Sequence, residues 1–194
     1  MYARLISSEM RWLPAKVVIA LSIALAISDA GARDVFDDVK CGGLVANALV
    51  GKHLDNGPVA VTEKKHADLG LRHEGSDDIS DSLTYEAWTV CGGSYHLLVR
   101  GDVIRAVVRA DHSRSAPAFL GTCEADGSPT SYQLFAILKN PGAASSAPAP
   151  AGDKTSMPAE TAWRIDEANA KFVPTSPSGL MCPRQGISTA DGGP

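Results

Sequence analysis

The segment from Thr84 to Ala110 restricts the fold most, because its side chains alternate with a period of two. Three stretches show the pattern, namely "TYEAWTVC" (84–91), "SYHLLVR" (94–100) and "VIRAVVRA" (103–110). Gly92-Gly93 and Gly101-Asp102 separate them, and two-residue connections that contain glycine are typical of tight β-hairpins. The segment therefore predicts a three-stranded antiparallel meander.

The alternation also assigns side chains to the two faces of this meander. A two-residue turn at Gly101-Asp102 pairs Arg100 with Val103 and Leu98 with Arg105, since side chains on paired strands keep a common register. One face is then apolar and is expected to pack on helices; it consists of Tyr95, Leu97, Val99, Ile104, Ala106 and Val108. The other face, which we call the basic stripe, carries His96, Arg100, Arg105 and Arg109 beside Leu98 and Val107.

The basic stripe is the candidate binding surface. Arginine makes bidentate contacts with carboxylates and phosphates, so the stripe could hold an acidic protein surface or another anionic ligand. The alternative is a solvated outer face whose charges are balanced by acidic residues of neighbouring loops.

Helices are expected before the meander. "DVFDDVKCGGLVANALVGK" (34–52) has Asp34 as a helix N-cap, and Gly42 and Gly43 either end a short helix or let another backbone come close. A second helix is expected from Thr62 to Gly70. "RHEGSDDISDS" (72–82) is interpreted as an acidic, polar loop.

More strands are expected after the meander. Two of them flank the turn residues Asp126-Gly127-Ser128-Pro129, and the second, Tyr132 to Leu138, is apolar on both faces and therefore central. A Pro/Ala/Ser-rich linker follows at about 140–160, and "DEANA" (166–170) marks a last hairpin. The prediction is an α+β fold, with one or two N-terminal helices packed on an antiparallel sheet of about five to seven strands.

Residues 1–32 have the pattern of a signal peptide. Arg4, Arg11 and Lys16 precede an uncharged apolar run from Val17 to Ile27, and Ala30-Gly31-Ala32 offers a cleavage site before Arg33. A membrane-spanning helix needs about 20 apolar residues, so an uncleaved anchor is the alternative, and Met10 is an alternative start. The rest, residues 33–194, is expected to form a single domain in the periplasm or outside the cell.

The charge of the processed chain argues against nucleic acid as a partner. Cleavage removes three basic and two acidic residues, so the formal net charge changes from −4 to −5. Sequence-independent nucleic-acid binding rests on clustered lysines and arginines. No stable membrane insertion is expected after cleavage either.

The four cysteines, Cys41, Cys91, Cys123 and Cys182, all follow the signal peptide. An even number in an exported protein predicts disulfides, because that compartment is oxidising. Zinc sites and thioredoxin-like sites use close pairs such as C-x2-C, which the chain lacks. Four cysteines allow three pairings; we favour Cys41–Cys91 with Cys123–Cys182, although Cys91 is placed on the face of the basic stripe, away from the helices.

Other groups of reactive residue types do not form a recognisable site. Asp111-His112-Ser113 contains triad residues, but triads are assembled from distant segments. Three histidines lack metal-binding spacing and four acidic residues miss the calcium-loop pattern; these are His53, His66 and His73, and Glu74, Asp77, Asp78 and Asp81. We therefore predict no catalytic residue, metal ligand or cofactor.

Three function classes fit these features. The first is an exported, disulfide-stabilised binding or inhibitory module that acts through a sheet face and loops. The second is a structural protein of the cell envelope. The third is a metal-dependent or hydrolytic enzyme whose site residues are dispersed along the chain, although the features lean away from an enzyme.

Overall fold

A computed structural model describes residues 34–54, 57–113, 116–139 and 156–183. The chain divides into two units, Met1–Ala32 and Arg33–Pro194, and all described residues belong to the second. The predicted signal peptide, residues 140–155 of the predicted linker and the tail from 184 lie outside the described residues. The end of that linker, 156–160, is part of a strand.

Short helices form the first layer of this unit. They are α1 (Val45–Leu49), α2 (Val59–Lys65) and the 3-10 turn η1 (Ala67–Leu69). Val45 and Leu49 of α1 are buried, whereas α2 buries none of its residues. Polar contacts hold α2 in place instead: Glu63 Oε1 accepts a hydrogen bond from the His73 backbone N–H at 2.7 Å.

A four-stranded antiparallel sheet forms the second layer. Its strands lie in sequence order: β1 (Arg72–Ser80), β2 (Leu83–Val90), β3 (Gly93–Arg100) and β4 (Val103–Arg109). The predicted meander is confirmed, but its first turn lies one residue earlier than expected, at Cys91-Gly92. Both residues have positive φ, 52° and 75°, which is the requirement of a type I′ hairpin.

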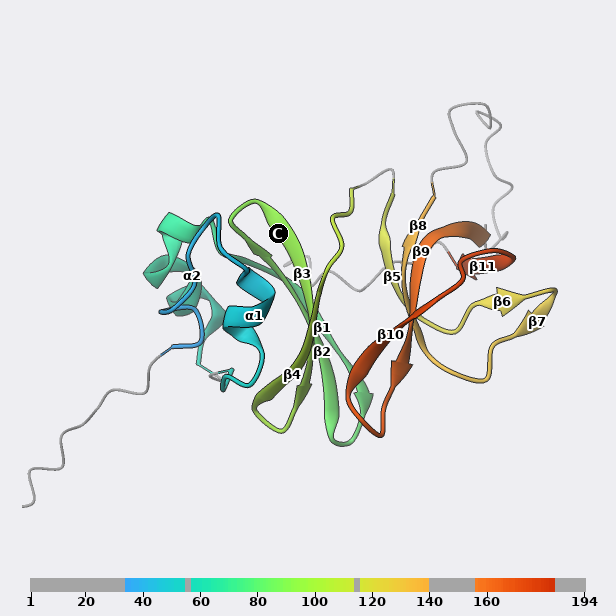
Figure 1. Cartoon of the computed structure of the whole chain (residues 1–194), viewed down its shortest axis with the longest axis horizontal. Coiled ribbons are helices and arrows are strands. Elements are labelled where there is room, and N and C mark those ends of the chain that lie inside the picture. The colour runs from blue at the N-terminus through green and yellow to red at the C-terminus, as the bar shows by residue number, and fades with distance from the viewer. Residues whose placement is uncertain (1–33, 55–56, 114–115, 140–155, 184–194) are drawn as a thin grey trace, which may run out of the picture. The chain divides into compact units, whose positions relative to one another are not determined.

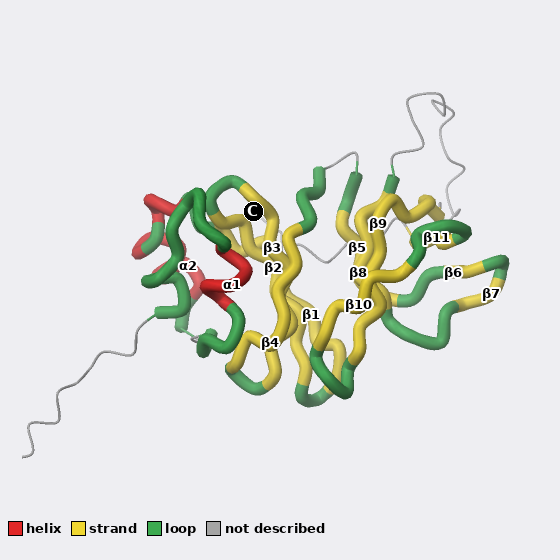
Figure 2. Tube along the Cα trace, viewed as in Figure 1, coloured by secondary structure: helices red, strands yellow, loops and turns green. Residues whose placement is uncertain are grey.

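Seven further strands form the third layer, in which the order is β5-β8-β9-β11-β6-β7 and β10 pairs with β9. They are β5 (Ala118–Gly121), β6 (Glu124–Ala125), β7 (Ser128–Pro129), β8 (Leu134–Leu138), β9 (Ser156–Asp166), β10 (Lys171–Thr175) and β11 (Leu180–Pro183). All five residues of β8 are buried, as expected for a central strand. The last hairpin, with its turn at 167–170, is present as predicted. The turn expected at 126–129 is shorter, because Ser128 and Pro129 form β7 and pair with β6, while β8 pairs with β5 and β9. Figure 2 shows how strands dominate this part of the chain.

Three separate apolar cores follow from this layering (Figure 1). The first lies between the helices and the four-stranded sheet, where Phe36, Leu49 and Leu97 are fully buried. The second lies between the two sheets and includes Tyr85, Leu98 and Phe135. The third lies within the seven-stranded sheet.

The α+β class and the antiparallel pairing are thus confirmed, while the expectation of one sheet is wrong. The inner face of the meander carries Leu83, Tyr85, Ala87 and Leu98 in addition to His96 and Arg100, two of the predicted polar residues. Such a face must be covered, because burying apolar surface is the main favourable term in folding. The second sheet covers it.

The predicted helices and the loop before the meander need correction. The first helix spans five residues rather than 34–52: Gly42 has φ 87°, a left-handed conformation that no helix continues through. Asp34 is not the N-cap of a helix, since no helix begins there: residues 35–38 form a turn, in which the Asp34 carboxylate accepts a hydrogen bond from the Phe36 N–H. The second helix begins earlier, at Val59. Residues 72–80, predicted as a loop, form strand β1.

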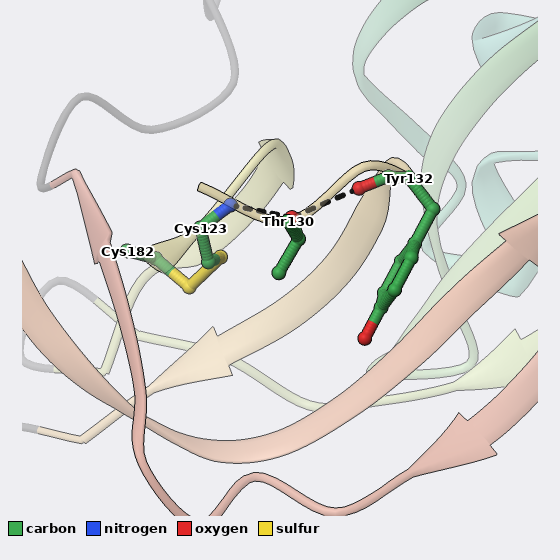
Figure 3. The surroundings of a disulfide bond; sticks show 4 residues. All are labelled: Cys123, Thr130, Tyr132 and Cys182. Atoms are coloured by element: carbon green, nitrogen blue, oxygen red, sulfur yellow. Dashed lines mark hydrogen bonds between the residues drawn. A yellow bond between two sulfur atoms is a disulfide. The ribbon is translucent and has the colours of Figure 1, made fainter. Parts of the chain in front are cut away.

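Two disulfides join Cys41 to Cys91 and Cys123 to Cys182, which is the pairing that we favoured. Cys91 reaches Cys41 because its position in the turn lets its side chain contact the helix-side core. Cys123 and Cys182 are buried in the third core. Thr130 Oγ1 accepts a hydrogen bond from the Cys123 N–H at 3.3 Å and donates one to the Tyr132 carbonyl at 3.0 Å. These two hydrogen bonds, drawn in Figure 3, fix the loop beside this disulfide.

Candidate functional site

A β-bulge at Arg105 changes the geometry of the predicted basic stripe. Leu98 pairs with Ala106, and Val99 pairs with Ile104, so that Arg105 has no partner of its own in the register. A bulge residue shifts all later side chains to the opposite face. Beyond Arg105, the faces of β4 are therefore the reverse of those predicted.

The four residues of the basic stripe consequently lie in different surroundings. His96 is fully buried between the two sheets. Arg100 donates hydrogen bonds to the backbone carbonyls of Glu167 and Ala168, the latter at 3.1 Å. Arg105 is exposed on β4. Arg109 pairs with Tyr95 on the helix side, where it lies 6.0 Å from the Tyr95 ring and forms an ion pair with Asp111 at 3.0 Å. The structure does not bring them together on one face.

His96 is the centre of a buried polar pair. Its Nε2 lies 3.0 Å from the Ala110 carbonyl oxygen, which can only accept, so Nε2 carries the proton. The Tyr85 hydroxyl, 2.6 Å from Nδ1, then donates to that nitrogen. Burial lowers the pKa of His96 to about 4 and raises the pKa of Tyr85 well above its usual value. Both side chains are neutral at pH 7.

A second polar group lies beside this pair, at the bulge between His73 and Gly75 in β1. Glu74 accepts hydrogen bonds from Thr89 and, at 2.9 Å, from Arg72, and its Oε2 lies 3.4 Å from His112 Nε2. Burial by itself raises the pKa of Glu74, but the Thr89 and Arg72 hydrogen bonds and the charge of His112 together lower it. The His112 ring is 5.5 Å from that of His96. We call Glu74, Tyr85, Thr89, His96 and His112 the inter-sheet polar cluster.

The remaining three histidines also contact carboxylates. The closest distances are 2.8 Å from His53 to Asp102, 3.1 Å from His66 to Asp34 and 2.7 Å from His73 to Glu86. The first pair connects the segment after α1 to the β3–β4 turn, the second lies within the helical layer, and the third joins β1 to β2. Among the described residues, no three His, Cys, Asp or Glu side chains gather so as to hold a metal ion.

A different surface stands out beside the shortest helix. Leu44 and Val50, which flank α1, are 77% and 47% exposed, although both are large apolar residues. α1 packs against β4, and the chain after it pairs with the same strand, since the Gly51 N–H donates to the Ile104 carbonyl at 2.8 Å. Arg105 follows directly on β4. We call the exposed Leu44 and Val50, together with the exposed Arg105 and Arg109 of the strand that α1 contacts, the α1–β4 surface.

Sequence reasoning missed both of these features. The inter-sheet polar cluster depends on a bulge in β4, which the alternating pattern does not reveal, and on the stacking of a second sheet, which the order of the strands does not show. Leu44 could have been noticed, because it follows Gly42-Gly43 and falls outside the apolar stripe of the predicted helix. Of the four residues of the α1–β4 surface, the two arginines had been identified.

Comparison with known proteins does not indicate a function: no protein family, no curated protein and no solved structure matches the chain. Within the described ranges, none of the helices has the length and apolar character needed to span a bilayer. The fold and its surfaces are therefore the basis for a functional proposal.

Proposed function

We propose that this protein is an exported, disulfide-stabilised binding or inhibitory module that engages a protein partner through the α1–β4 surface. The observation that supports this proposal is the exposure of Leu44 and Val50 at the two ends of α1, a helix that contacts β4, the strand that carries the exposed Arg105. Protein interfaces typically combine an apolar centre with arginine, a residue enriched among the contacts that contribute most to affinity.

The location of this surface follows from the layering. Helices cover one face of the four-stranded sheet and the second sheet covers the other. A sheet face is thus not free to bind, and the function that we expected for the basic stripe passes to its two exposed members, Arg105 and Arg109. Because both are cationic, the proposed partner presents carboxylates around an apolar contact.

Export is part of the same proposal. Two disulfides are consistent with an oxidising compartment, and the sequence before residue 33 has the pattern of a signal peptide. We propose the periplasm or the cell exterior as the location, with neither nucleic acid nor a stable membrane insertion involved.

Site-specific photo-crosslinking in the producing cells tests the surface. A photoreactive side chain at position 44 or 50 is expected to capture one discrete partner. With the photoreactive side chain at position 50, Leu44→Asp or Arg105→Glu is expected to reduce that adduct at least tenfold, which is about 1.4 kcal/mol of binding. The matched controls are Met181→Asp, an apolar residue that is 37% exposed on β11, and Lys171→Glu on β10.

The outcomes separate the function classes. Loss of the adduct in the surface variants but not in the controls supports a binding module. A structural envelope protein predicts that the surface variants have no effect, while loss of a disulfide alters envelope integrity. If no adduct forms at position 44 or 50, the α1–β4 surface has no binding role.

A further inference from the structure

The helices and the four-stranded sheet form one half of the domain, and the seven-stranded sheet forms the other. Each of the two disulfides lies within one half. Cys41–Cys91 joins the helical layer to the four-stranded sheet, and Cys123–Cys182 lies in the core of the seven-stranded sheet. The core between the two sheets contains no cysteine. Only the segment from β4 to β5 connects the halves along the chain. Contact between the sheets therefore rests on noncovalent packing.

That packing surrounds His96. The ring centroids of His96 and Phe135 of β8 are 4.3 Å apart, and Phe135 in turn contacts Trp163 of β9 and Phe172 of β10 at 5.4 and 5.8 Å. The seven-stranded sheet thus presents three aromatic side chains to this region. None of them can accept a hydrogen bond from an imidazolium in the way that a carboxylate would.

A proton added to His96 finds no hydrogen-bond acceptor unless the Tyr85 hydroxyl reorients. Nε2 already carries a hydrogen for the Ala110 carbonyl, so the new proton goes to Nδ1, which now accepts from Tyr85. The Tyr85 hydroxyl must then turn from donor to acceptor, and its hydrogen loses its partner. A buried charge and an unsatisfied hydroxyl both cost free energy, and opening the gap between the sheets relieves both.

We propose that His96 is an acid-sensitive switch between the two sheets: its protonation separates the seven-stranded sheet from the four-stranded sheet, while each disulfide-linked half keeps its own core. This inference is independent of the proposed binding function. It assigns a role to the inter-sheet polar cluster, which shares no residue with the α1–β4 surface.

Other ionisable groups around His96 modulate the switch. Glu74 of β1 and Asp111 favour the imidazolium, and His112, between Glu74 and His96, opposes it when charged. Tyr85 of β2 stays protonated, because burial raises its pKa. Phe135, Trp163 and Phe172, which face the cluster from β8, β9 and β10, carry no charge. The carboxylates are too few to offset burial, since the pKa of His96 is lowered to about 4.

The direction of the pH effect follows from this lowered pKa. In the opened state, His96 regains the ordinary value of 6.5, so between pH 6.5 and pH 4 the opened state binds more protons than the closed state. Opening therefore becomes more favourable as the pH falls through this range and gains nothing further from His96 below it.

Two tryptophans report on the two cores separately. Trp163 lies at the inter-sheet core and Trp88 in the helix-side core. W12F/W88F leaves Trp163 as the reporter and W12F/W163F leaves Trp88, whether or not residues 1–32 have been cleaved. We expect the Trp163 emission maximum to shift to longer wavelength between pH 6.5 and 4, while that of Trp88 shifts only at lower pH. Shifts of both residues at one common pH would overturn the proposal.

His96→Gln provides the decisive variant. The glutamine amide can donate to Ala110 and accept from Tyr85, but it does not titrate in this range. We expect the Trp163 transition to move down by about one pH unit or more, whereas the control His53→Gln, at an exposed histidine, leaves it unchanged. An unchanged transition in His96→Gln would contradict the switch.

If His96→Gln fails to fold, nitrogen NMR of the wild-type imidazoles replaces it. His96 must then be the neutral Nε2–H tautomer at pH 6, and its protonation must coincide with the Trp163 shift. Protonation of His96 without any change at Trp163 would equally contradict the proposal.

Discussion

Arg100 connects the end of β3 to the turn between β9 and β10. Its guanidinium donates hydrogen bonds to the carbonyls of Glu167 and Ala168, and those carbonyls lie in a four-residue turn that ends at Ala170 with φ 49°. Because a charged donor makes a strong hydrogen bond, Arg100→Met should lower the free energy of unfolding by about 2 kcal/mol. Urea denaturation at pH 7 measures this loss.

Arg105→Met is the matched control for Arg100. Arg105 is exposed and, within the part of the chain that the structure describes, no ion pair involves it. The free energy of unfolding of this variant should lie within about 0.5 kcal/mol of the wild-type value. If Arg100→Met and Arg105→Met lowered the free energy of unfolding equally, the Arg100 hydrogen bonds would contribute nothing specific.

Arg105 also shows why the basic stripe was only partly predictable. Next to the turn at Gly101, the expected pairing of Arg100 with Val103 is observed. Arg105, the extra residue in β4, then reverses the face assignment of every β4 residue that follows it. Alternating patterns do not reveal a bulge here, because Val107 and Val108 are both apolar and fit either face.

β1 is the edge strand of the four-stranded sheet, and three features restrict further pairing at this edge. Its register is interrupted between His73 and Gly75 and between Asp78 and Ser80. The His73 N–H is bound by Glu63, and the Ile79 carbonyl lies 3.5 Å from Gln133 Nε2. Asp77 and Asp78 are exposed in the middle. Bulges and charges are the usual protection of edge strands against association.

The acidic pair on β1 should therefore keep the protein from self-association. We expect D77T/D78T to dimerise or aggregate at concentrations where the wild type does not, because threonine favours strands and removes the repulsion. D77K/D78K is the matched control: it alters the same positions but keeps them charged, and it should behave as the wild type. Light scattering coupled to size exclusion measures both; equal self-association of the two variants would show that charge is not the protection.

β1 illustrates the limit of pattern-based prediction for whole elements. The meander was predictable, because apolar residues alternate along it and glycines mark its turns. β1 carries mostly polar residues, since it lies at an edge and only Gly75 and Ile79 are buried. Its strand conformation is determined by pairing with β2, a tertiary contact that overrides local composition.

The number of sheets is a property of the whole chain. Strand segments were recognised on both sides of residue 117, but nothing in their order shows that the two groups stack face to face. Leu98 and Tyr85 on the inner face, together with the fully apolar β8, were the available signals. They become decisive only once the bulge in β4 is known.

The two disulfides allow the stabilities of the halves to be compared. Their sequence separations of 50 and 59 residues are nearly equal, so each should contribute about 4 kcal/mol by restricting the unfolded chain. Cys123 and Cys182 are also buried, whereas Cys41 is exposed. C123A/C182A therefore loses packing in addition, and we expect it to be the less stable variant.

Urea unfolding of C41A/C91A and C123A/C182A, together with intact mass after thiol alkylation, tests this expectation. The proposed export and cleavage predict that the wild type contains no free thiol and begins at Arg33, and each variant should retain the other disulfide. If C41A/C91A is the less stable, the exposed disulfide contributes more than chain restriction explains, and the helical layer depends on it. Because that layer carries Leu44 and Val50, the same variant should then also lose the photo-crosslinked partner, which links the stability of one half to the proposed binding surface.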